Sequence, residues 1–349
     1  MESRDLTLDY AKALCIVLMV VGHCCYINHF TLFIYTFHMP CFFFISGMLL
    51  SDICVENVKY GIIHKIRSYY LPFVKWSILF ILLHNLFTYM GLQSGFYDVK
   101  TTMTKVLRVF LLKQSEPMLS QLWFLASLTI SSMLAVFTTH FLKKKKQLNI
   151  KFLCLSIAIS LSLSVILSYV EINGLVTMVR ISFFANSFYL SGFLFRHQNL
   201  MKRFLSAGCM LLYIIGAICP LFIKLEFFGT RELSILLYYV VAMCGILATI
   251  SLSRKLAEIR YFNVLSFIGR NTLYILVFHY LAFKLVSFGY VMMTGEDIEL
   301  LAQNVIYAPE WWLWIVYSVV GVAIPLLISY FLCVAVLKSE NNHNLFPNL

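Results

Sequence analysis

The chain has 349 residues, of which 61% are hydrophobic and only 12% are charged, and its mean hydropathy is +0.84. Soluble domains carry about 25% charged residues, so this composition excludes a sizeable soluble domain and predicts a polytopic integral membrane protein. The formal net charge of +11 does not indicate binding to nucleic acid, because the basic residues lie in loops between apolar segments, where membrane topology accounts for them.

Apolar segments long enough to cross a bilayer follow one another along the whole chain. They lie near residues 9–28, 33–50, 70–91, 121–141, 152–170, 178–195, 205–223, 233–253, 264–288 and 312–337. We therefore predict an all-α fold of about ten transmembrane helices, forming a single transmembrane domain over residues 1–349. The sixth segment gives the weakest signal, because Arg180 and Asn186 dilute it.

The charges of the loops predict the orientation of these helices. One alternating set of loops is basic and includes Lys59, Lys65, Arg67, the run Lys143 to Lys146, Arg196, Lys202, Arg203, Arg254 and Arg260. The other set is mostly acidic and includes Asp98, Glu116, Glu171, Glu226, Glu232, Glu296, Asp297, Glu299 and Glu310. By the positive-inside rule, both termini are expected in the cytoplasm.

The two longest outer connections, near residues 92–120 and 289–311, are candidates for covering a site from outside the membrane. Within the first, residues 105–112 have the pattern of a short amphipathic helix at the interface. The ten cysteines lie mostly in apolar segments, with no CxxC pair and no metal-ligand spacing, so we expect neither a disulfide framework nor a metal site. The N-terminal segment does not have the pattern of a cleavable signal.

The first apolar segment combines charged residues with a histidine. Asp9, Lys12 and His23 fall close to one face of a helix, because the eleven residues from Lys12 to His23 turn it by about 1100°, roughly 20° past three full turns. The rise is about 16 Å, so Lys12 does not contact His23, but both face one route from the membrane surface to its interior. Ionisable residues inside a membrane helix indicate function. The alternatives are snorkelling for Asp9 and Lys12 and simple packing for His23.

Three histidines are predicted at a similar depth in the membrane. His23 and His38 are symmetric about a turn near residue 30, and His279 lies about fifteen residues along an outward-running segment. All three are therefore expected in the outer half of the bilayer. Pro40 predicts a kink near His38. The other polar residues inside the spans are Lys75, His84, Arg180 and Lys284, of which Lys75 and Lys284 are expected to snorkel.

Four local motifs, taken together, are typical of one family. They are the stretch from Asp9 through Lys12 to His23; Phe37-His38-Met39-Pro40 through Ser46-Gly47; Arg67-Ser68-Tyr69-Tyr70-Leu71-Pro72 with the later Leu122-Trp123-Phe124-Leu125; and Ile268-Gly269-Arg270-Asn271-Thr272-Leu273-Tyr274 leading to His279, with Leu190-Ser191-Gly192 as a weaker echo. In this order they resemble the membrane-bound acyltransferase-3 family, which transfers acyl groups, commonly acetyl, to surface glycans and related acceptors. Lys12 and His23 reproduce its basic-residue, ten-residue gap, histidine pattern.

The resemblance implies an integral membrane O-acyltransferase. Its donor would be cytoplasmic acyl-CoA, acetyl-CoA in the common members, and its acceptor a hydroxyl of a surface glycan or lipid-linked saccharide. Membrane lipids would surround it, and no metal would take part. A bacterial inner membrane is the expected location. Lys12 stands where many members have arginine, so bidentate gripping of phosphate is not expected. No esterase-like extracytoplasmic domain is recognisable, so the membrane domain itself would select the acceptor.

The chemistry of the residues agrees with this implication. Acyl transfer to a hydroxyl needs a base or nucleophile that works near neutral pH, and histidine is the natural choice. His23 is expected to deprotonate the acceptor directly or to carry the acyl group transiently, and we favour the direct base. His38 and His279 are candidates for orienting His23, binding the acceptor or stabilising the oxyanion.

The charged residues near the inner mouth suit the phosphates of acyl-CoA. Lys12, Arg67 and Arg270 are expected to bind them, and Asp9 is expected to orient Lys12 from three residues earlier on the helix. Arg270 is equally well explained as an anchor next to the membrane. The phosphopantetheine arm is long enough to carry the thioester from Lys12 to His23.

Other interpretations of the sequence remain open. A transporter or flippase of lipid-linked glycans would also use a charged stripe inside ten helices, but it predicts inverted repeats or paired broken helices, which the sequence lacks. A glycan polymerase would have larger outer loops, and a sensor would not need Lys12 and His23 on one face. Ser46 and Ser266 have neither a G-x-S-x-G motif nor an acidic partner. Trp123 is more typical of an interfacial anchor than of a substrate platform.

Overall fold

The computed structural model describes residues 6–25, 29–170, 174–204, 213, 214, 218, 233–259, 263–307 and 310–344, with side chains described up to Cys333. Within these ranges the regular structure is entirely helical, and nine segments are long and apolar enough to cross a membrane. They confirm nine of the ten predicted spans. The tenth, 205–223, lies outside the described residues apart from three isolated positions.

The elements follow one another with short connections. In chain order they are α1 (Leu6–Cys24), α2 (His29–Met48), α3 (Asp52–Glu56), α4 (Val58–Lys65), η1 (Ile66–Tyr70), α5 (Leu71–Tyr89), α6 (Val99–Phe110), η2 (Pro117–Leu122), α7 (Trp123–Lys144), α8 (Ile150–Ser168), α9 (Gly174–His197), α10 (Met201–Phe204), α12 (Leu233–Glu258), α13 (Asn263–Arg270), α14 (Thr272–Thr294), η4 (Ile298–Ala302) and α15 (Leu313–Asn344).

The predicted span 264–288 is wrong as a single helix, because the chain breaks at Asn271 between α13 and α14. Asn271 leaves the helical region, with φ −107° and ψ 20°. Its side-chain amide donates to the carbonyl of Phe267, and its side-chain oxygen accepts from the Ser329 hydroxyl. Asparagine commonly competes with the helical backbone in this way. The break separates a short helix that carries Arg270 from the membrane helix that carries His279.

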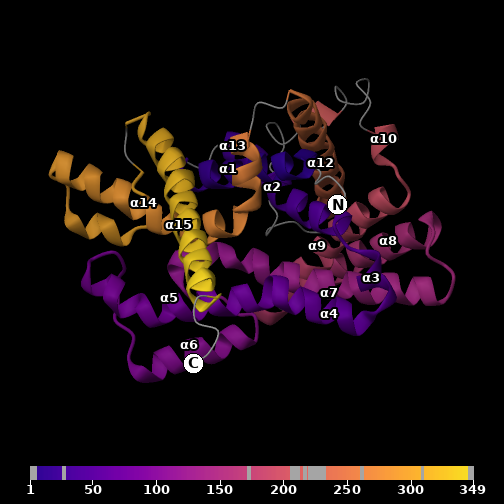
Figure 1. Cartoon of the computed structure of the whole chain (residues 1–349), viewed down its shortest axis with the longest axis horizontal. Coiled ribbons are helices and arrows are strands. Elements are labelled where there is room, and N and C mark those ends of the chain that lie inside the picture. The colour runs from indigo at the N-terminus through magenta and orange to yellow at the C-terminus, as the bar shows by residue number, and fades with distance from the viewer. Residues whose placement is uncertain are drawn as a thin grey trace.

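The helices pack around α1 and α2 (Figure 1). α1 lies against α2, α12, α13, α14 and α15, and α2 also packs against α9 and α12. α4 and η1 lie beside α7, α5 continues from η1, and the amphipathic helix α6 lies along α5. The helix predicted within residues 105–112 is therefore confirmed over its first part, as the C-terminal half of α6.

Two glycine positions explain why motifs from distant parts of the chain meet. A Cβ on Gly47 of α2 would lie 1.9 Å from the Tyr189 carbonyl oxygen, and one on Gly192 of α9 would lie 1.9 Å from the Phe44 carbonyl oxygen. These reciprocal clashes show that α2 and α9 touch backbone to backbone, which only small residues allow. The Ser46-Gly47 motif and its echo Ser191-Gly192 thus form one packing contact.

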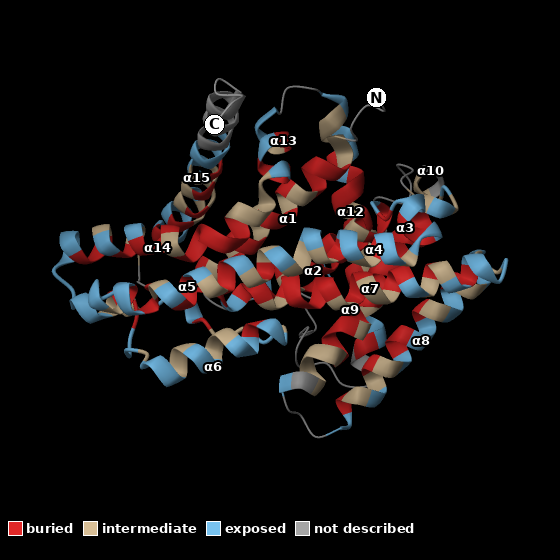
Figure 2. Cartoon of the chain, turned by 60° about the horizontal axis from the view of Figure 1, so that its bottom comes forward, coloured by how far each residue is buried: buried red, intermediate tan, exposed pale blue. Residues whose placement is uncertain are grey.

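The distribution of burial fits a protein surrounded by lipid. Buried residues gather along α1, α2, α7 and α9, while outward-facing helix surfaces are exposed (Figure 2). Those surfaces carry large apolar side chains, including Leu82, Ile159, Ile166, Val319 and Phe331. Apolar surface on this scale is unsuited to water and is typical of a membrane interaction surface.

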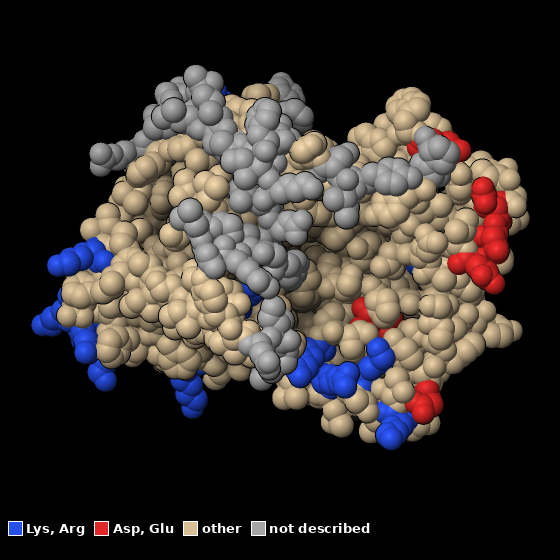
Figure 3. All heavy atoms as spheres, turned by 180° about the vertical axis from the view of Figure 1, so that it is seen from behind, with Lys and Arg blue, Asp and Glu red and all other residues tan. Residues whose placement is uncertain are grey.

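Charged side chains gather toward both ends of the long axis of the molecule. Lysine and arginine side chains project from one end, where α7 finishes in its lysine run. Acidic side chains gather at the opposite end, beyond α14, and a second group of basic side chains lies below them (Figure 3). The lysine run and the acidic group agree with the predicted alternation of basic and acidic loops, whereas the second basic group does not. The assignment of the basic end to the cytoplasm stays a prediction from the positive-inside rule.

Lys284 corrects one expectation from the sequence. Its side chain is 2% exposed and does not snorkel, because its ammonium group donates to the carbonyls of Leu301, Ala302 and Gln303 at 2.6–3.2 Å. These carbonyls belong to the end of η4 and the residue after it. Lys284 therefore holds the connection after α14 against that helix.

Candidate active site

The first part of the site is a charged cluster at the start of α1. The Asp9 carboxylate lies 2.8 Å from the ammonium nitrogen of Lys12, one helical turn away, and 3.6 Å from Nε of Arg270. Asp9 is buried, whereas the Lys12 side chain is 18% exposed and that of Arg270 is 49% exposed. One buried carboxylate therefore holds two cations beside each other, and the cluster carries a net positive charge.

The approach of α13 to α1 creates this cluster. A Cβ on Gly269 would lie 1.9 Å from the backbone oxygen of Asp9, so the two helices touch at a point that tolerates no side chain. This contact places the next residue, Arg270, against the Asp9 carboxylate. The Ile268-Gly269-Arg270 motif therefore needs glycine at its centre, because any side chain there would push α13 away from α1.

A cavity of about 230 Å³ opens beside Lys12. We call it the lysine cavity. Its walls come from α1, α2, η1, α7 and α14, and they include Lys12, Ile16, Met39, Phe42, Ser46, Ser68, Tyr69, Phe124, Leu125, Thr272, Leu273 and Leu276. Each of the four sequence motifs contributes to this lining. Residues scattered along most of the chain therefore surround one space.

Arg67 is not among the residues that surround this space. Its side chain is exposed, while its neighbours Ser68 and Tyr69 line the lysine cavity from the π-helical turn η1. The structure thus brings Lys12, Asp9 and Arg270 together and leaves Arg67 at a nearby surface.

The second part of the site is a pair of histidines deeper in the bundle. The imidazole of His23, at the end of α1, stacks on that of His279, in the middle of α14, with ring centroids 5.3 Å apart and planes inclined by 25°. His279 is fully buried and His23 is half-buried. Two histidines separated by 256 positions in the sequence therefore share one site.

The hydrogen bonds of His279 define its tautomer. Its Nδ1 lies 3.0 Å from the carbonyl oxygen of Ile275 and 3.1 Å from that of Leu276. A carbonyl only accepts, so Nδ1 carries the hydrogen and Nε2 carries the lone pair in the neutral ring. That Nε2 is buried and has no hydrogen-bond partner among the described residues. An unpartnered buried acceptor of this kind suits a substrate hydroxyl.

His38 has the same tautomer and lies beside the pair. Its Nδ1 donates to the Ile34 carbonyl oxygen at 2.7 Å, which again leaves the lone pair on Nε2. The Tyr35 ring is close to both sites, 5.5 Å from the ring of His38 and 6.3 Å from that of His23. The Tyr35 hydroxyl donates to the Gly22 carbonyl oxygen at 2.6 Å. Tyr35 thereby ties α2 to the end of α1.

The polar surroundings of the pair include side chains that the sequence did not single out. The Tyr280 hydroxyl lies 3.1 Å from Nδ1 of His23 and also interacts with Ser120. Gln121 donates at 2.7 Å to the Leu276 carbonyl, which His279 also uses. The chain has 20 tyrosines and 31 phenylalanines, so composition hides Tyr280. Its position directly after His279 is the one signal that points to it.

The lysine cavity ends close to the histidines without reaching them. Of the residues that line the cavity, Met39 directly follows His38 in the chain, and Leu276 lies one turn before His279. Ile16, from α1, lies one turn beyond Lys12 on the way to His23. The cavity thus covers part of the distance between the charged cluster and the imidazole pair.

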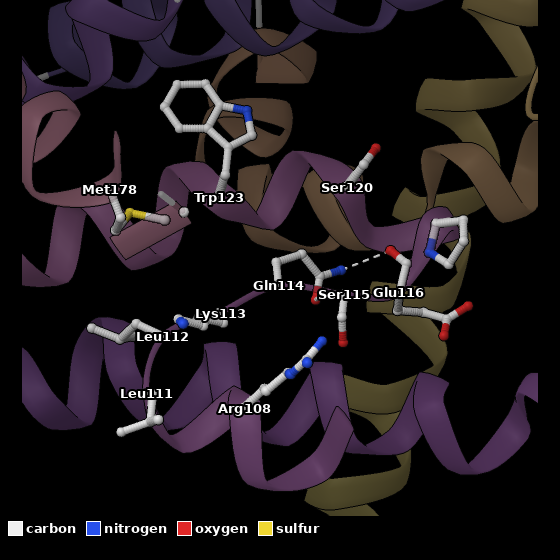
Figure 4. Close-up of a pocket in the computed structure, with 12 residues that line it drawn as sticks. Arg108, Leu111, Leu112, Lys113, Gln114, Ser115, Glu116, Ser120, Trp123 and Met178 are labelled. Carbon is white, nitrogen blue, oxygen red and sulfur yellow. Dashed lines mark hydrogen bonds between the residues drawn. The ribbon is translucent and has the colours of Figure 1, made fainter. Parts of the chain in front are cut away.

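A second cavity, of about 450 Å³, lies on the other side of the start of α7 (Figure 4). We call it the loop cavity, because residues 111–117 form much of its wall. Arg108, Lys113, Ser115, Ser120, Trp123 and Met178 are among the residues that line it. Trp123 and Phe124 are consecutive, yet the first lines the loop cavity and the second the lysine cavity.

This fold and site define a class of protein: a polytopic membrane bundle with a basic cluster at one level and a histidine pair deeper inside. Comparison with known families is more specific. The chain belongs to the acyltransferase-3 family, since that family's model, described as an acyltransferase domain, matches residues 5–330. No curated protein and no solved structure gives a significant match. The protein is therefore a membrane acyltransferase.

Proposed function

We propose that this acyltransferase moves an acyl group, acetyl in the simplest case, from cytoplasmic acyl-CoA to a hydroxyl of a surface or lipid-linked glycan. The bacterial inner membrane, where acyl-CoA and such glycans meet, is part of the proposal. The observation that carries it is the lysine cavity, which begins at a basic cluster, takes lining residues from all four motifs and extends toward two stacked histidines.

The basic cluster suits the phosphates of the donor. Lys12 and Arg270 supply two cations against the single carboxylate of Asp9, and both remain partly exposed. Phosphate oxygens bind such cations through charge-assisted hydrogen bonds. Asp9 then has the role of holding both cations in place, because a buried carboxylate restricts the geometry of two flexible side chains. Arg67 precedes Ser68 and Tyr69 of the cavity wall on η1, so it is proposed as an outer contact.

The histidine pair suits the transfer step. His23 takes the proton of the acceptor hydroxyl as its oxygen attacks the thioester carbonyl carbon. The ester C–O bond forms, the thioester C–S bond breaks, and the proton passes from His23 to the sulfur, so that free CoA leaves as a thiol. In this scheme His23 is the base, and transient acylation of His23 is the alternative order of events.

The tautomers favour one of the roles open to His38 and His279. In both neutral rings Nδ1 donates to backbone and Nε2 is an acceptor, so neither presents a hydrogen to a developing oxyanion. Both can accept the hydrogen of a sugar hydroxyl. We therefore assign them to acceptor binding and to orienting His23, and we regard the Tyr280 hydroxyl as a better candidate for contact with the oxyanion.

The test is an assay of the purified protein in detergent with labelled acetyl-CoA and a glycan acceptor. We expect acceptor-dependent release of CoA, which His23→Ala lowers by about 10²- to 10⁴-fold, the usual contribution of general-base catalysis. The matched control is His64→Ala, because His64 is an exposed histidine of α4. Equal turnover in the two variants would refute the role of His23.

Two additional readouts sharpen the outcome of this assay. Label that stays on the protein in the absence of acceptor, and disappears in His23→Ala, would show that His23 carries the acyl group. Glycan flux into proteoliposomes without any acyl-CoA would support transport in place of transfer.

Lys12 is expected to act on donor binding more than on chemistry. Lys12→Ala removes one of the two cations, so the Kd for acyl-CoA should rise by about tenfold, equivalent to about 1.4 kcal/mol. The rate of transfer at saturating acyl-CoA should change little. Lys12→Arg keeps the charge and should retain most of the affinity. An unchanged Kd in Lys12→Ala would remove Lys12 from the donor site.

A further inference from the structure

We propose that the loop cavity is the acceptor site and that it selects a saccharide bearing a negatively charged group, either a phosphate or a carboxylate. This inference rests on the proposed function, because it names the chemical class of the acceptor. It starts from a cavity of about 450 Å³, which is large enough for a sugar unit and lies apart from the basic cluster proposed to bind the donor.

The charge available in this cavity is positive. Arg108, on the last turn of α6, and Lys113 both line it with exposed side chains. Glu116 is the one acidic residue of its lining, and it is 1% exposed. A ligand in the loop cavity therefore meets two cations, while the carboxylate faces away into the protein.

The Glu116 carboxylate is occupied by other side chains. Its Oε1 lies 3.0 Å from Nδ1 of His84 and accepts from the Gln93 amide at 3.4 Å, and its Oε2 accepts from the Tyr97 hydroxyl at 3.3 Å. Lys105 contributes to the same arrangement by donating to the Ser115 carbonyl at 2.7 Å. These contacts satisfy the oxygens of Glu116 inside the protein and tie its loop to α5 and α6.

The remaining lining matches a sugar. Trp123 offers an indole ring, and aromatic rings pack against the apolar face of a saccharide. The Ser115 hydroxyl is buried in the cavity wall and has no hydrogen-bond partner among the described residues. Figure 4 shows Arg108 reaching toward the turn that carries Ser115. An aromatic wall, an unused hydroxyl and two cations together fit an anionic saccharide better than an uncharged lipid.

A chain of contacts connects this cavity to the reacting histidine. Ser120 lines the cavity and interacts with Tyr280, whose hydroxyl lies 3.1 Å from Nδ1 of His23. The lysine cavity approaches the same histidines from the other side, where Leu276 and Met39 line it. Donor and acceptor would thus reach His23 from two different cavities, as transfer across a membrane requires.

The test measures binding of three small probes to the full-length protein in detergent: glucose 6-phosphate, methyl glucuronide and methyl glucoside. We expect at least one anionic probe to bind about tenfold more tightly than methyl glucoside. Arg108→Gln should abolish most of that difference without changing the affinity for methyl glucoside, and Arg108→Lys should restore part of it. The matched control is Lys100→Gln, which removes an exposed charge from the same helix α6 away from the cavity.

Each outcome of this experiment is informative. Preference for the phosphate or for the carboxylate supports the proposal and identifies the anion. Equal affinity for all three probes overturns it, as does an equal loss in Arg108→Gln and Lys100→Gln. Binding is measured without acyl-CoA, so it does not depend on the proposed reaction. If the protein binds an anionic probe selectively but never releases CoA, the proposed site is supported and the proposed reaction fails.

Discussion

In the described part of the chain, the buried histidines His84 and His279 differ in how many of their ring nitrogens have hydrogen-bond partners. At His84, Nε2 donates to the Gly95 carbonyl at 2.8 Å and Nδ1 shares a proton with the Glu116 carboxylate at 3.0 Å. The Tyr97 ring lies flat on this imidazole, 3.4 Å away and inclined by 4°. At His279, by contrast, Nε2 has no partner among the described residues.

Under the proposed function, this difference distinguishes a structural histidine from one that contacts substrate. An imidazole with both nitrogens satisfied has nothing to offer a substrate, and its contacts hold the connection between α5 and α7 in place. An imidazole with a free acceptor nitrogen, stacked on the half-buried ring of His23, is available for substrate. Buried polar atoms without partners are rare in folded proteins and call for an explanation.

The largest effect that sharpens this comparison is expected at His84. His84→Ala leaves Glu116 buried without its main partner, and breaking a buried pair costs about 3 kcal/mol or more. We expect this loss in the free energy of unfolding, measured by SDS titration in mixed micelles. The Kd for acyl-CoA of the folded protein should stay unchanged. The exposed His64→Ala serves as control, and equal stability of the two variants would show that the His84 contacts contribute little.

The opposite pattern is expected at His279. In His279→Asn the side-chain amide can still donate to the Ile275 carbonyl, but nothing replaces Nε2. Turnover should therefore fall by about 10²-fold, within the range for a residue that holds a reacting hydroxyl, while stability changes little. The readouts are CoA release and the same unfolding titration. A large loss of stability with normal turnover per folded molecule would make His279 a structural residue like His84.

Sequence reasoning found the part of the site that depends on local geometry. The helical spacing of Asp9 and Lys12 predicts their contact, and the structure has it at 2.8 Å. The proximity of His23 and His279 was anticipated only as a similar depth, from approximate helix boundaries. Which ring nitrogen is free depends on backbone carbonyls one turn away, and the type of residue does not determine it.

Contacts that depend on tertiary packing were not predictable. Arg270 reaches Asp9 because α13 ends at Asn271 and touches α1 at Gly269, whereas hydropathy indicated one continuous helix. Lys284 was expected to reach the membrane surface, but carbonyls from η4 surround its ammonium group. In both residues the deciding partner lies on another element, and hydropathy and spacing carry no information about it.

The smallest effect concerns the pH dependence of the structural cluster. Burial raises the pKa of the Glu116 carboxyl above its ordinary 4.5, although His84, Lys105 and Tyr97 each act to lower it. The folded protein therefore holds this proton more tightly than the unfolded chain. The resulting stability is fully present below pH 4.5 and is lost as the pH rises through the raised pKa.

Glu116→Gln isolates this contribution, because the amide has a similar shape and does not titrate. As the pH falls through the raised pKa, we expect the Tm of the wild type to rise relative to that of Glu116→Gln, by on the order of 1–2 °C. The measurement is thermal unfolding in detergent between about pH 4 and pH 8. A Tm difference that stays constant over this range, or that shifts toward the variant on acidification, would contradict a raised pKa of Glu116. The His84–Glu116 pair would then hold the carboxylate ionised at least as firmly as solvent does. The comparison of His84 with His279 would rest on their hydrogen bonds alone.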